Sequence, residues 1–380
     1  MTSKIAFLFT LVSLLSPVLA ATNQFQHWYP EYRHIFQRIL RQNCSDEYAF
    51  YLAGRKNFTR FEYYDRWIGA VNTSQLAFPP ASCVLDHTSE WMKFNMAAAA
   101  VLLGLTPSIL GALGPSVEEM SSLFIIARRP LLGICLAAGA PSLYPFRTFD
   151  YKEAIARLQD RNPHVRPRLF TRSYQYLVMI VEFIFAIGAI ANNVTNSYQL
   201  GMQTSCVFAP QLWFLPILWA FLSILTHLFS ALALRTRVNC ERPYKTFIDW
   251  LRIQFTPIAE QKPLRVEPCE ETRFSLVVAW WVSCYNPGLL IFGTITFSSL
   301  IFITVRDALA VIARYLTSLL VCRAILMYEL GVLRAKYREE YERPESDQEL
   351  QALRTKPDER LTLAQTWSEH GADAQEVRDF

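Results

Sequence analysis

The chain has 380 residues, of which 52% are hydrophobic and 14% aromatic, and its formal net charge is +4. The apolar residues fall in a few long blocks, which excludes an ordinary soluble domain and is typical of an all-α polytopic membrane protein. The basic residues gather mainly in two loops, and no basic tract carries interleaved aromatic residues. The composition therefore predicts the lipid bilayer as a partner and gives no indication of a nucleic-acid partner.

The N-terminus predicts a signal peptide over residues 1–20. A lysine precedes an apolar stretch that ends at Leu15, and small residues around Ala20 suit cleavage. An uncleaved anchor helix is the alternative, although the apolar stretch is short for a span. Residues 21–92 are polar and rich in aromatic side chains, which predicts a small lumenal or extracellular domain.

Three Asn-x-Ser/Thr sequons in this segment predict N-glycosylation at Asn43, Asn57 and Asn72. Three sequons within some seventy residues after a signal peptide support one another.

The cysteines predict one disulfide and no metal site. Cys44 and Cys83 share the oxidising compartment, so a disulfide between them is expected to add roughly 2 to 4 kcal/mol. Cys206, in the next lumenal loop, is a rival partner. No paired Cys-x-x-Cys spacing occurs. His87 and its acidic neighbours before the first span resemble metal ligands only loosely, and a solvated surface is the preferred interpretation.

Five apolar runs are long enough to cross a bilayer and place the membrane region at 93–331, followed by a charged cytosolic tail over 332–380. The predicted spans lie near 94–114, 174–191, 212–234, 279–305 and 308–330. The fourth run is interrupted by Asn286-Pro287-Gly288, which predicts a kink or an early interfacial turn.

A hairpin of two spans, 174–191 and 212–234, determines the predicted topology. Its polar loop holds a fourth sequon, Asn193-Val194-Thr195, and glycosylation of Asn193 requires that loop to be lumenal. Both outer ends of the hairpin are then cytosolic. The flanking loops are rich in Lys and Arg, which agrees with the positive-inside rule.

Residues 116–146 predict two short helices rather than a span. Arg128-Arg129-Pro130 divides the apolar sequence, and a span here would bury both arginines and reverse the topology downstream. We expect a re-entrant or interfacial helix pair on the cytosolic side, with both arginines at the headgroups. A second interfacial helix is predicted near Trp250, where apolar residues form one stripe.

Two ionisable residues inside the hairpin are the candidate site. Glu182 and His227 lie at similar depths below the cytosolic surface, because their distances along the helices from Arg172 and Arg235 are similar. A protonated Glu182 oriented by His227 could act as an acid or in a proton relay. The alternative is an interhelical hydrogen bond that holds the hairpin together.

The sequence contains no Gly-x-Ser-x-Gly elbow, no phosphate-binding Gly-Lys-Ser/Thr loop, no His-Glu-x-x-His and no Gly-x-Gly-x-x-Gly opening a helix. Hydrolase, ATPase, zinc protease and dinucleotide-dependent functions lose their usual support, and no cofactor is predicted.

Three segments carry a resemblance: NCSDEY from Asn43, LGLTPS from Leu103, and IIARRP ending at Pro130. Together with the signal peptide they resemble a group of poorly characterised multi-pass membrane proteins of filamentous fungi. The layout is also similar to that of accessory membrane proteins in secondary-metabolite clusters of the paxilline-type indole-diterpene kind. The resemblance implies a setting beside membrane-bound biosynthetic enzymes, in the endoplasmic reticulum, another endomembrane or the plasma membrane. It carries over no functional residue.

Three functions follow as hypotheses. The first is a non-catalytic accessory protein of terpenoid-type secondary metabolism. The second is an integral-membrane cyclase or isomerase that protonates an apolar substrate through Glu182. The third is a small transporter or receptor, for which transport would respond to a proton gradient.

Overall fold

The structure is a computed structural model that describes residues 24–53, 77–143, 172–239, 246–261, 267–268 and 272–355. The predicted signal peptide, Asn57 and Asn72 lie outside these residues. The helices are α2 Arg33–Gln42, α3 Ser45–Ala53, α5 Phe78–Asp86, α6 Glu90–Leu113, α7 Val117–Ile125, α8 Pro130–Gly139, α10 Arg172–Gln203, α11 Leu215–Arg235, α12 Phe247–Gln254, the 3-10 helix η3 Ile258–Glu260, α13 Arg273–Ser298 and α14 Val305–Thr355.

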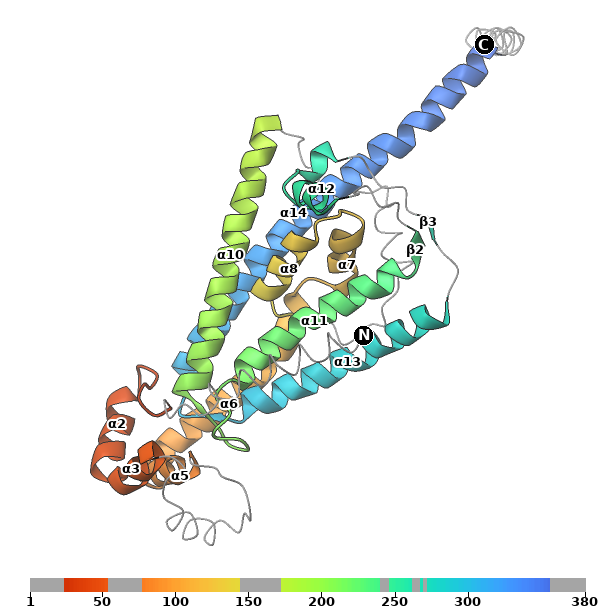
Figure 1. The fold of residues 1–380 in the computed structure, drawn as a ribbon. Coiled ribbons are helices and arrows are strands. Elements are labelled where there is room, and N and C mark those ends of the chain that lie inside the picture. Colours follow the sequence, from red (N-terminus) through yellow and green to blue (C-terminus); the bar gives the residue numbers. More distant parts are fainter. Residues whose placement is uncertain are drawn as a thin grey trace, which may run out of the picture.

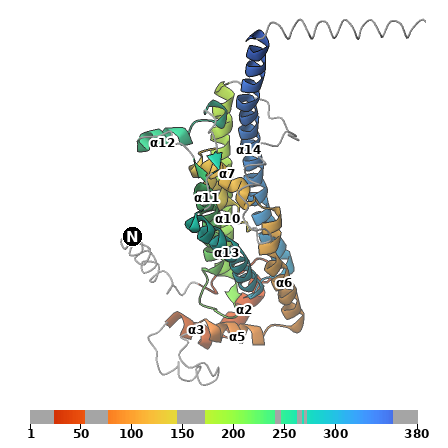
Figure 2. The same ribbon diagram turned by 90° about the vertical axis from the view of Figure 1, so that its right-hand side faces the viewer.

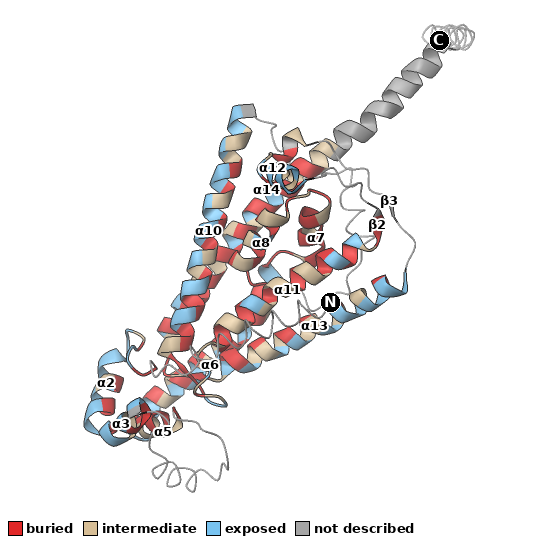
Figure 3. Cartoon of the chain, viewed as in Figure 1, coloured by how far each residue is buried: buried red, intermediate tan, exposed pale blue. Residues whose placement is uncertain are grey.

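The predicted all-α membrane fold is confirmed. Five helices are long and apolar enough to cross a membrane: α6, α10, α11, α13 and the part of α14 that runs from Val305 to Lys336. The chain is a multi-pass membrane protein. Large apolar side chains point outward, and the outer faces of α10 and α13 are exposed along much of their length (Figure 3). Such faces suit contact with lipid.

The five long helices form a bundle in which α10 packs on α14, α11 packs on α13, and α6 contacts both α13 and α14. Helices α7 and α8 lie between these pairs in the half of the bundle away from α2, α3 and α5 (Figure 1). The buried residues of α6, α7, α8, α10, α11, α13 and α14 make one continuous apolar core. The two short helices are present as predicted, and they are packed inside the bundle.

Two short strand pairs connect the ends of the long helices. At the N-terminal end, β1 (Ser205–Cys206) pairs antiparallel with β4 (Leu300–Ile301). At the opposite end, β2 (Val238–Asn239) pairs antiparallel with β3 (Glu267–Pro268). The first pair joins the turn after α10 to the turn before α14, so both hairpins of the bundle are tied at the same end.

Helices α2, α3 and α5 enclose a small separate core of aromatic and aliphatic residues. Phe302, from the turn before α14, inserts into it against Trp28 and Phe36, with ring centroids 5.2 Å and 5.4 Å away. Burial raises the pKa of Tyr51 to about 12, so its hydroxyl stays protonated while accepting the backbone N–H of Gln24 at 3.1 Å. The N-terminal helices are therefore attached to the end of the membrane bundle.

Helix α10 continues to Gln203, twelve residues beyond the predicted end at 191, and the polar segment 192–203 is helical instead of forming a loop. The predicted loop is wrong here because the polar side chains find partners on neighbouring helices. Asn192 Nδ2 donates to Ser318 Oγ at 2.8 Å, and Asn196 Nδ2 donates to the carbonyl of Val311 at 3.1 Å. Polar residues that pair across helices are compatible with a buried helix.

The fourth span also differs from its prediction of 279–305. Helix α13 begins at Arg273, passes through Pro287 without a break and ends at Ser298. The chain then forms β4 before α14 begins at Val305. The turn between the last two spans therefore lies before Arg306, in the residues between α13 and α14. Leu300 and Ile301 of this turn pair with β1 through their backbones and are not helical.

Candidate functional site

The turn between α7 and α8 directs an arginine into the bundle. Helix α7 begins with a capping box in which Ser116 and Glu119 satisfy each other's backbone N–H groups. After α7 ends at Ile125, Arg128 adopts a left-handed backbone conformation with φ 54°, and Pro130 starts α8. We call residues 126–130 the arginine turn. The reversal at Arg128 sends the following side chain, Arg129, toward α10 and α14.

Arg129 forms a buried ion-pair triad with one carboxylate from each of two spans. Its Nη1 contacts Glu329 Oε1 of α14 and lies 3.4 Å from Glu182 Oε2 of α10. The exposed fractions are 0% for Arg129, 5% for Glu182 and 4% for Glu329. The guanidinium carbon lies 5.7 Å from the ring centroid of Phe183, within cation–π range.

The prediction that Arg129 lies at the headgroups is therefore wrong. That prediction assigned the arginine the insertion cost of an unpaired cation. In the folded bundle Glu182 and Glu329 supply counter-charges, and a charge that is paired can be buried.

The triad has more negative than positive groups. With every group ionised it carries one positive and two negative charges. Within the described part of the chain, Arg129 Nε and Nη2, Glu182 Oε1 and Glu329 Oε2 have no hydrogen-bond partner. The triad is therefore unevenly charged and incompletely hydrogen-bonded, which is the kind of intramembrane cluster that marks ion pathways as well as structural contacts.

Helix α12 covers the arginine turn. The side chain of Gln254 donates to the carbonyl of Arg128 at 3.0 Å and accepts the backbone N–H of Leu131 at 3.1 Å. The ring of Phe255 lies 5.6 Å from that of Phe183. These contacts connect α12 to the turn that carries Arg129 and to the helix that carries Glu182.

The residues after α12 extend this cover to the ends of two spans. Glu260 of η3 accepts the hydroxyl of Tyr176 at 3.0 Å. Lys336 Nζ donates to the carbonyl of Gln261 at 2.5 Å. The segment 246–261 is therefore bound to α8, α10 and α14, and we call it the cover segment.

The predicted pairing of Glu182 with His227 is wrong, because each has other partners. Glu182 faces Arg129, whereas His227 Nε2 lies 3.3 Å from Ser142 Oγ, and no hydrogen bond joins the two predicted residues. His227 is fully buried, and its Nδ1 has no hydrogen-bond partner among the described residues. Among the described residues no acid reaches this nitrogen, so the contact between Ser142 and His227 lacks the third member of a catalytic triad.

Asn193 is buried between two helices, whereas a glycosylated asparagine must be exposed to solvent. It is 2% exposed within α10, and its Nδ2 donates to the carbonyl of Ala138 in α8 at 2.7 Å. A glycan attached to Nδ2 would have to occupy the contact between α10 and α8, so modification is incompatible with this packing. By contrast, Asn43 is exposed beside the N-terminal helices. Glycosylation there remains a prediction.

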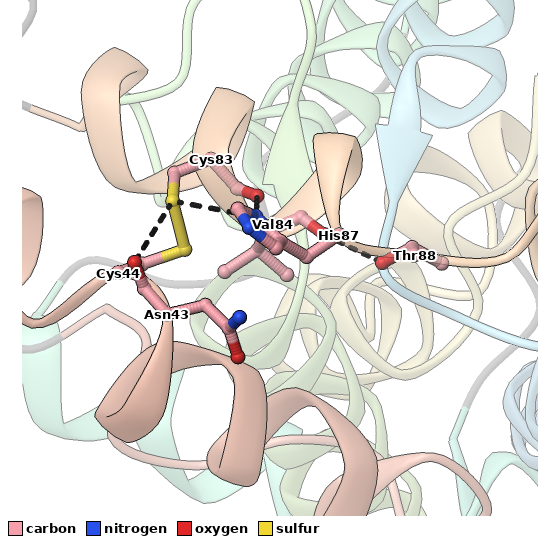
Figure 4. The surroundings of a disulfide bond; sticks show 6 residues. All are labelled: Asn43, Cys44, Cys83, Val84, His87 and Thr88. Carbon is pink, nitrogen blue, oxygen red and sulfur yellow. Dashed lines mark hydrogen bonds between the residues drawn. A yellow bond between two sulfur atoms is a disulfide. The ribbon is translucent and has the colours of Figure 1, made fainter.

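The predicted disulfide between Cys44 and Cys83 is confirmed (Figure 4). It joins the start of α3 to α5 with a Cα–Cα distance of 5.9 Å. The rival Cys206 is a buried free cysteine that contacts Ser299 Oγ at 3.0 Å. His87 Nδ1 lies 3.8 Å from Cys83 Sγ. Because the two sulfur atoms are bonded to each other, this cluster does not offer thiolate ligands to a metal.

Arg314 belongs to a second polar network, between α14 and α10. Its guanidinium donates to Asn192 Oδ1 at 3.1 Å, to Gln199 Oε1 at 2.5 Å and to Thr195 Oγ1 at 3.0 Å. Among the described residues the hydrogen-bond acceptors of this cation are neutral oxygens, and the network ties the two helices together. These contacts also account for the helical form of the segment that contains the sequon.

Two members of the triad were not among the sequence-predicted site residues. Glu329 is the acidic residue in the apolar run 308–330, which is a signal that composition alone could have supplied. Arg129 was recognised as unusual but was assigned to the surface. Only the packing of α8 between α10 and α14 brings the three charges together.

Comparison with protein-family models, with curated proteins and with solved structures finds no match for this chain.

Proposed function

We propose that this chain is a non-catalytic multi-pass membrane protein that serves membrane-bound enzymes as an accessory component. The observation that supports this proposal is the engagement of Glu182, which was the candidate acid, in the triad with Arg129 and Glu329. The terpenoid-type secondary-metabolite setting rests on the resemblance of the sequence to fungal accessory membrane proteins.

The geometry disfavours Glu182 as a general acid. A general acid must come within hydrogen-bond reach of the substrate atom that it protonates. Glu182 is buried, and one of its oxygens contacts Arg129. Its position suits a link between α10 and the arginine turn.

Substitution of Glu182 separates the accessory function from the enzymatic one. In Glu182→Gln, Arg129 keeps Glu329 as its counter-charge, so we expect normal abundance and normal pathway output. An abundant Glu182→Gln protein that abolishes product formation would overturn the non-catalytic proposal. Arg252→Gln, which changes an exposed residue of α12, is the matched control.

The pathway setting requires a separate experiment. Deletion of the gene in a producing fungus should lower the amount of the terpenoid-type product. No biosynthetic intermediate should accumulate in an amount that matches the product lost. Proximity labelling from the C-terminal tail should recover membrane-bound biosynthetic enzymes. An unchanged metabolite profile together with labelling of unrelated membrane proteins would contradict this setting.

A second candidate is a small transporter or receptor, which the uneven charge of the triad favours. Ionisable groups inside membrane bundles are frequent in proton and ion pathways. The full-length protein in sealed proteoliposomes should then accumulate a substrate when a proton gradient is imposed, and Glu329→Gln should abolish that response. A gradient-independent distribution of all tested substrates would contradict transport.

A further inference from the structure

Helix α12 presents an apolar face that no other described part of the chain covers. Phe247 and Ile248 are 72% and 74% exposed, and Leu251 and Phe255 are also exposed. Phe247, Ile248 and Leu251 share one face of α12. Phe255 follows the last helical residue, and its ring also contacts that of Phe183. Asp249 lies on the opposite side of the helix. An exposed apolar face of this kind is typical of a surface that has a partner.

The orientation of α12 fits a membrane surface. The helix extends sideways from the bundle, across the direction of the spans, at the end opposite the N-terminal helices (Figure 2). Eleven residues separate it from the end of α11 at Arg235, and Gln254 binds it to the arginine turn. An amphipathic helix that lies across the spans at their ends occupies the headgroup region.

We propose that the apolar face of α12 binds the lipid interface on the predicted cytosolic side and that Gln254 thereby holds the arginine turn in position. The outward-facing side chains of the long helices are also apolar and suit contact with lipid. The rings of Phe247 and Trp250 stack with their centroids 5.4 Å apart. Aromatic side chains are enriched at the membrane interface.

The coupling follows from the two hydrogen bonds of Gln254. Its side chain is 1% exposed and binds one backbone group on each side of Arg129, the carbonyl of Arg128 and the N–H of Leu131. A displacement of α12 away from the lipid surface would move this amide relative to the arginine turn. Seating of α12 in lipid therefore stabilises the turn that supplies the arginine of the triad.

Photo-cross-linking tests the partner. Benzoylphenylalanine is introduced in place of Phe247 or, as a matched control, in place of Asp249, in the full chain reconstituted in phosphatidylcholine nanodiscs. We expect lipid adducts at position 247 and at least about tenfold fewer at position 249. When the apolar face of α12 lies in the lipid interface, the opposite face of the helix points away from lipid. A cross-link between two copies of the chain, or equal lipid labelling at both positions, would overturn the proposal.

Hydrogen exchange of the Leu131 amide tests the coupling. Ile248→Asp should accelerate its exchange about tenfold, as Gln254→Ala does, because loss of the hydrogen bond exposes this N–H. Asp249→Asn is the control and should leave exchange unchanged. An unchanged rate in Ile248→Asp would overturn the coupling. The N–H of Met120 in α7 donates to the carbonyl of Ser116 at 3.1 Å and serves as a second control. Equal acceleration of exchange at Met120 would also overturn the coupling.

Discussion

At the scale of single residues, Arg129 has the most demanding environment in the described structure. A buried cation is tolerated only when counter-charges and hydrogen bonds replace its hydration. Here Glu182 and Glu329 provide the counter-charges, from helices that are distant from Arg129 in sequence. The three residues therefore act as one unit, and substitutions in them should not be additive.

The triad predicts an asymmetric response to substitution. Arg129→Gln leaves two buried carboxylates without a cation and should cost about 3 to 5 kcal/mol of stability. Glu182→Gln and Glu329→Gln each leave one ion pair intact and should be much milder, whereas the double variant leaves Arg129 unpaired and should be severe. Thermal unfolding in detergent, with Arg252→Gln as the exposed control, measures these differences. Equal losses in all the single variants would contradict the pairing.

Asn193 predicts a second residue-level result. Because its amide is buried against Ala138, Asn193→Gln should leave the endoglycosidase-sensitive mobility of the protein unchanged. The predicted site at Asn43 is exposed, so Asn43→Gln should remove one endoglycosidase-sensitive increment. A glycan found on Asn193 would show that α10 ends earlier than described.

At the scale of elements, the close approach of α8 to α10 and α14 brings Arg129 near its partners. A Cβ at Gly139 would lie 2.8 Å from Cys322 Sγ of α14 and 3.0 Å from Ala189 Cβ of α10. Small residues at helix crossings in membrane proteins permit such contacts. The glycine therefore allows α8 to enter the space between the two spans.

This contact predicts that Gly139→Ala destabilises the bundle by about 1 to 3 kcal/mol, because an added methyl group overpacks the crossing. Gly188 of α10 is the matched control, since a Cβ there meets no atom within 4 Å. Gly188→Ala should be neutral or slightly stabilising. Melting in detergent compares the two variants, and equal effects would argue against the close crossing.

At the scale of the whole molecule, the odd number of candidate spans among the described residues places the N-terminal helices and the far end of α14 on opposite sides of the membrane. Five helices meet the requirement for spanning, and the N-terminal helices and the far end of α14 lie at opposite ends of the bundle (Figure 1). The arginine turn and the cover segment lie at the end where α14 leaves the bundle. The triad is therefore closer to the predicted cytosolic surface than to the N-terminal helices.

This arrangement predicts the result of protease protection. In sealed microsomes, added protease should remove a tag at the C-terminus and should leave the N-terminal domain intact, because the positive-inside rule places the C-terminal side in the cytosol. Detergent should expose both ends. Protection of the C-terminal tag without detergent would require an even number of spans or an inverted bundle.

Much of the fold was predictable because its determinants are local. Span number follows from the length and apolarity of each run, and Arg128-Arg129-Pro130 marks the division between two short helices. The Cys44–Cys83 pair followed from the shared compartment. Of the triad, the sequence predicted only Glu182 as a site residue, because its charge stands out in an apolar run. The predicted partner of Glu182 was His227, whereas the structure pairs it with Arg129.

The sequence by itself determined the number of candidate spans and the unusual position of charged residues, because these depend on length, composition and neighbouring residues. It favoured the disulfide between Cys44 and Cys83, and the structure decided against the rival Cys206. Only the tertiary structure decided that Arg129 is buried, that Glu329 joins it and that the segment around Asn193 is helical. The physical reason is that a polar side chain can be satisfied by water or by another helix. Which of the two applies depends on the faces that packing brings together, and that information is not local in the chain.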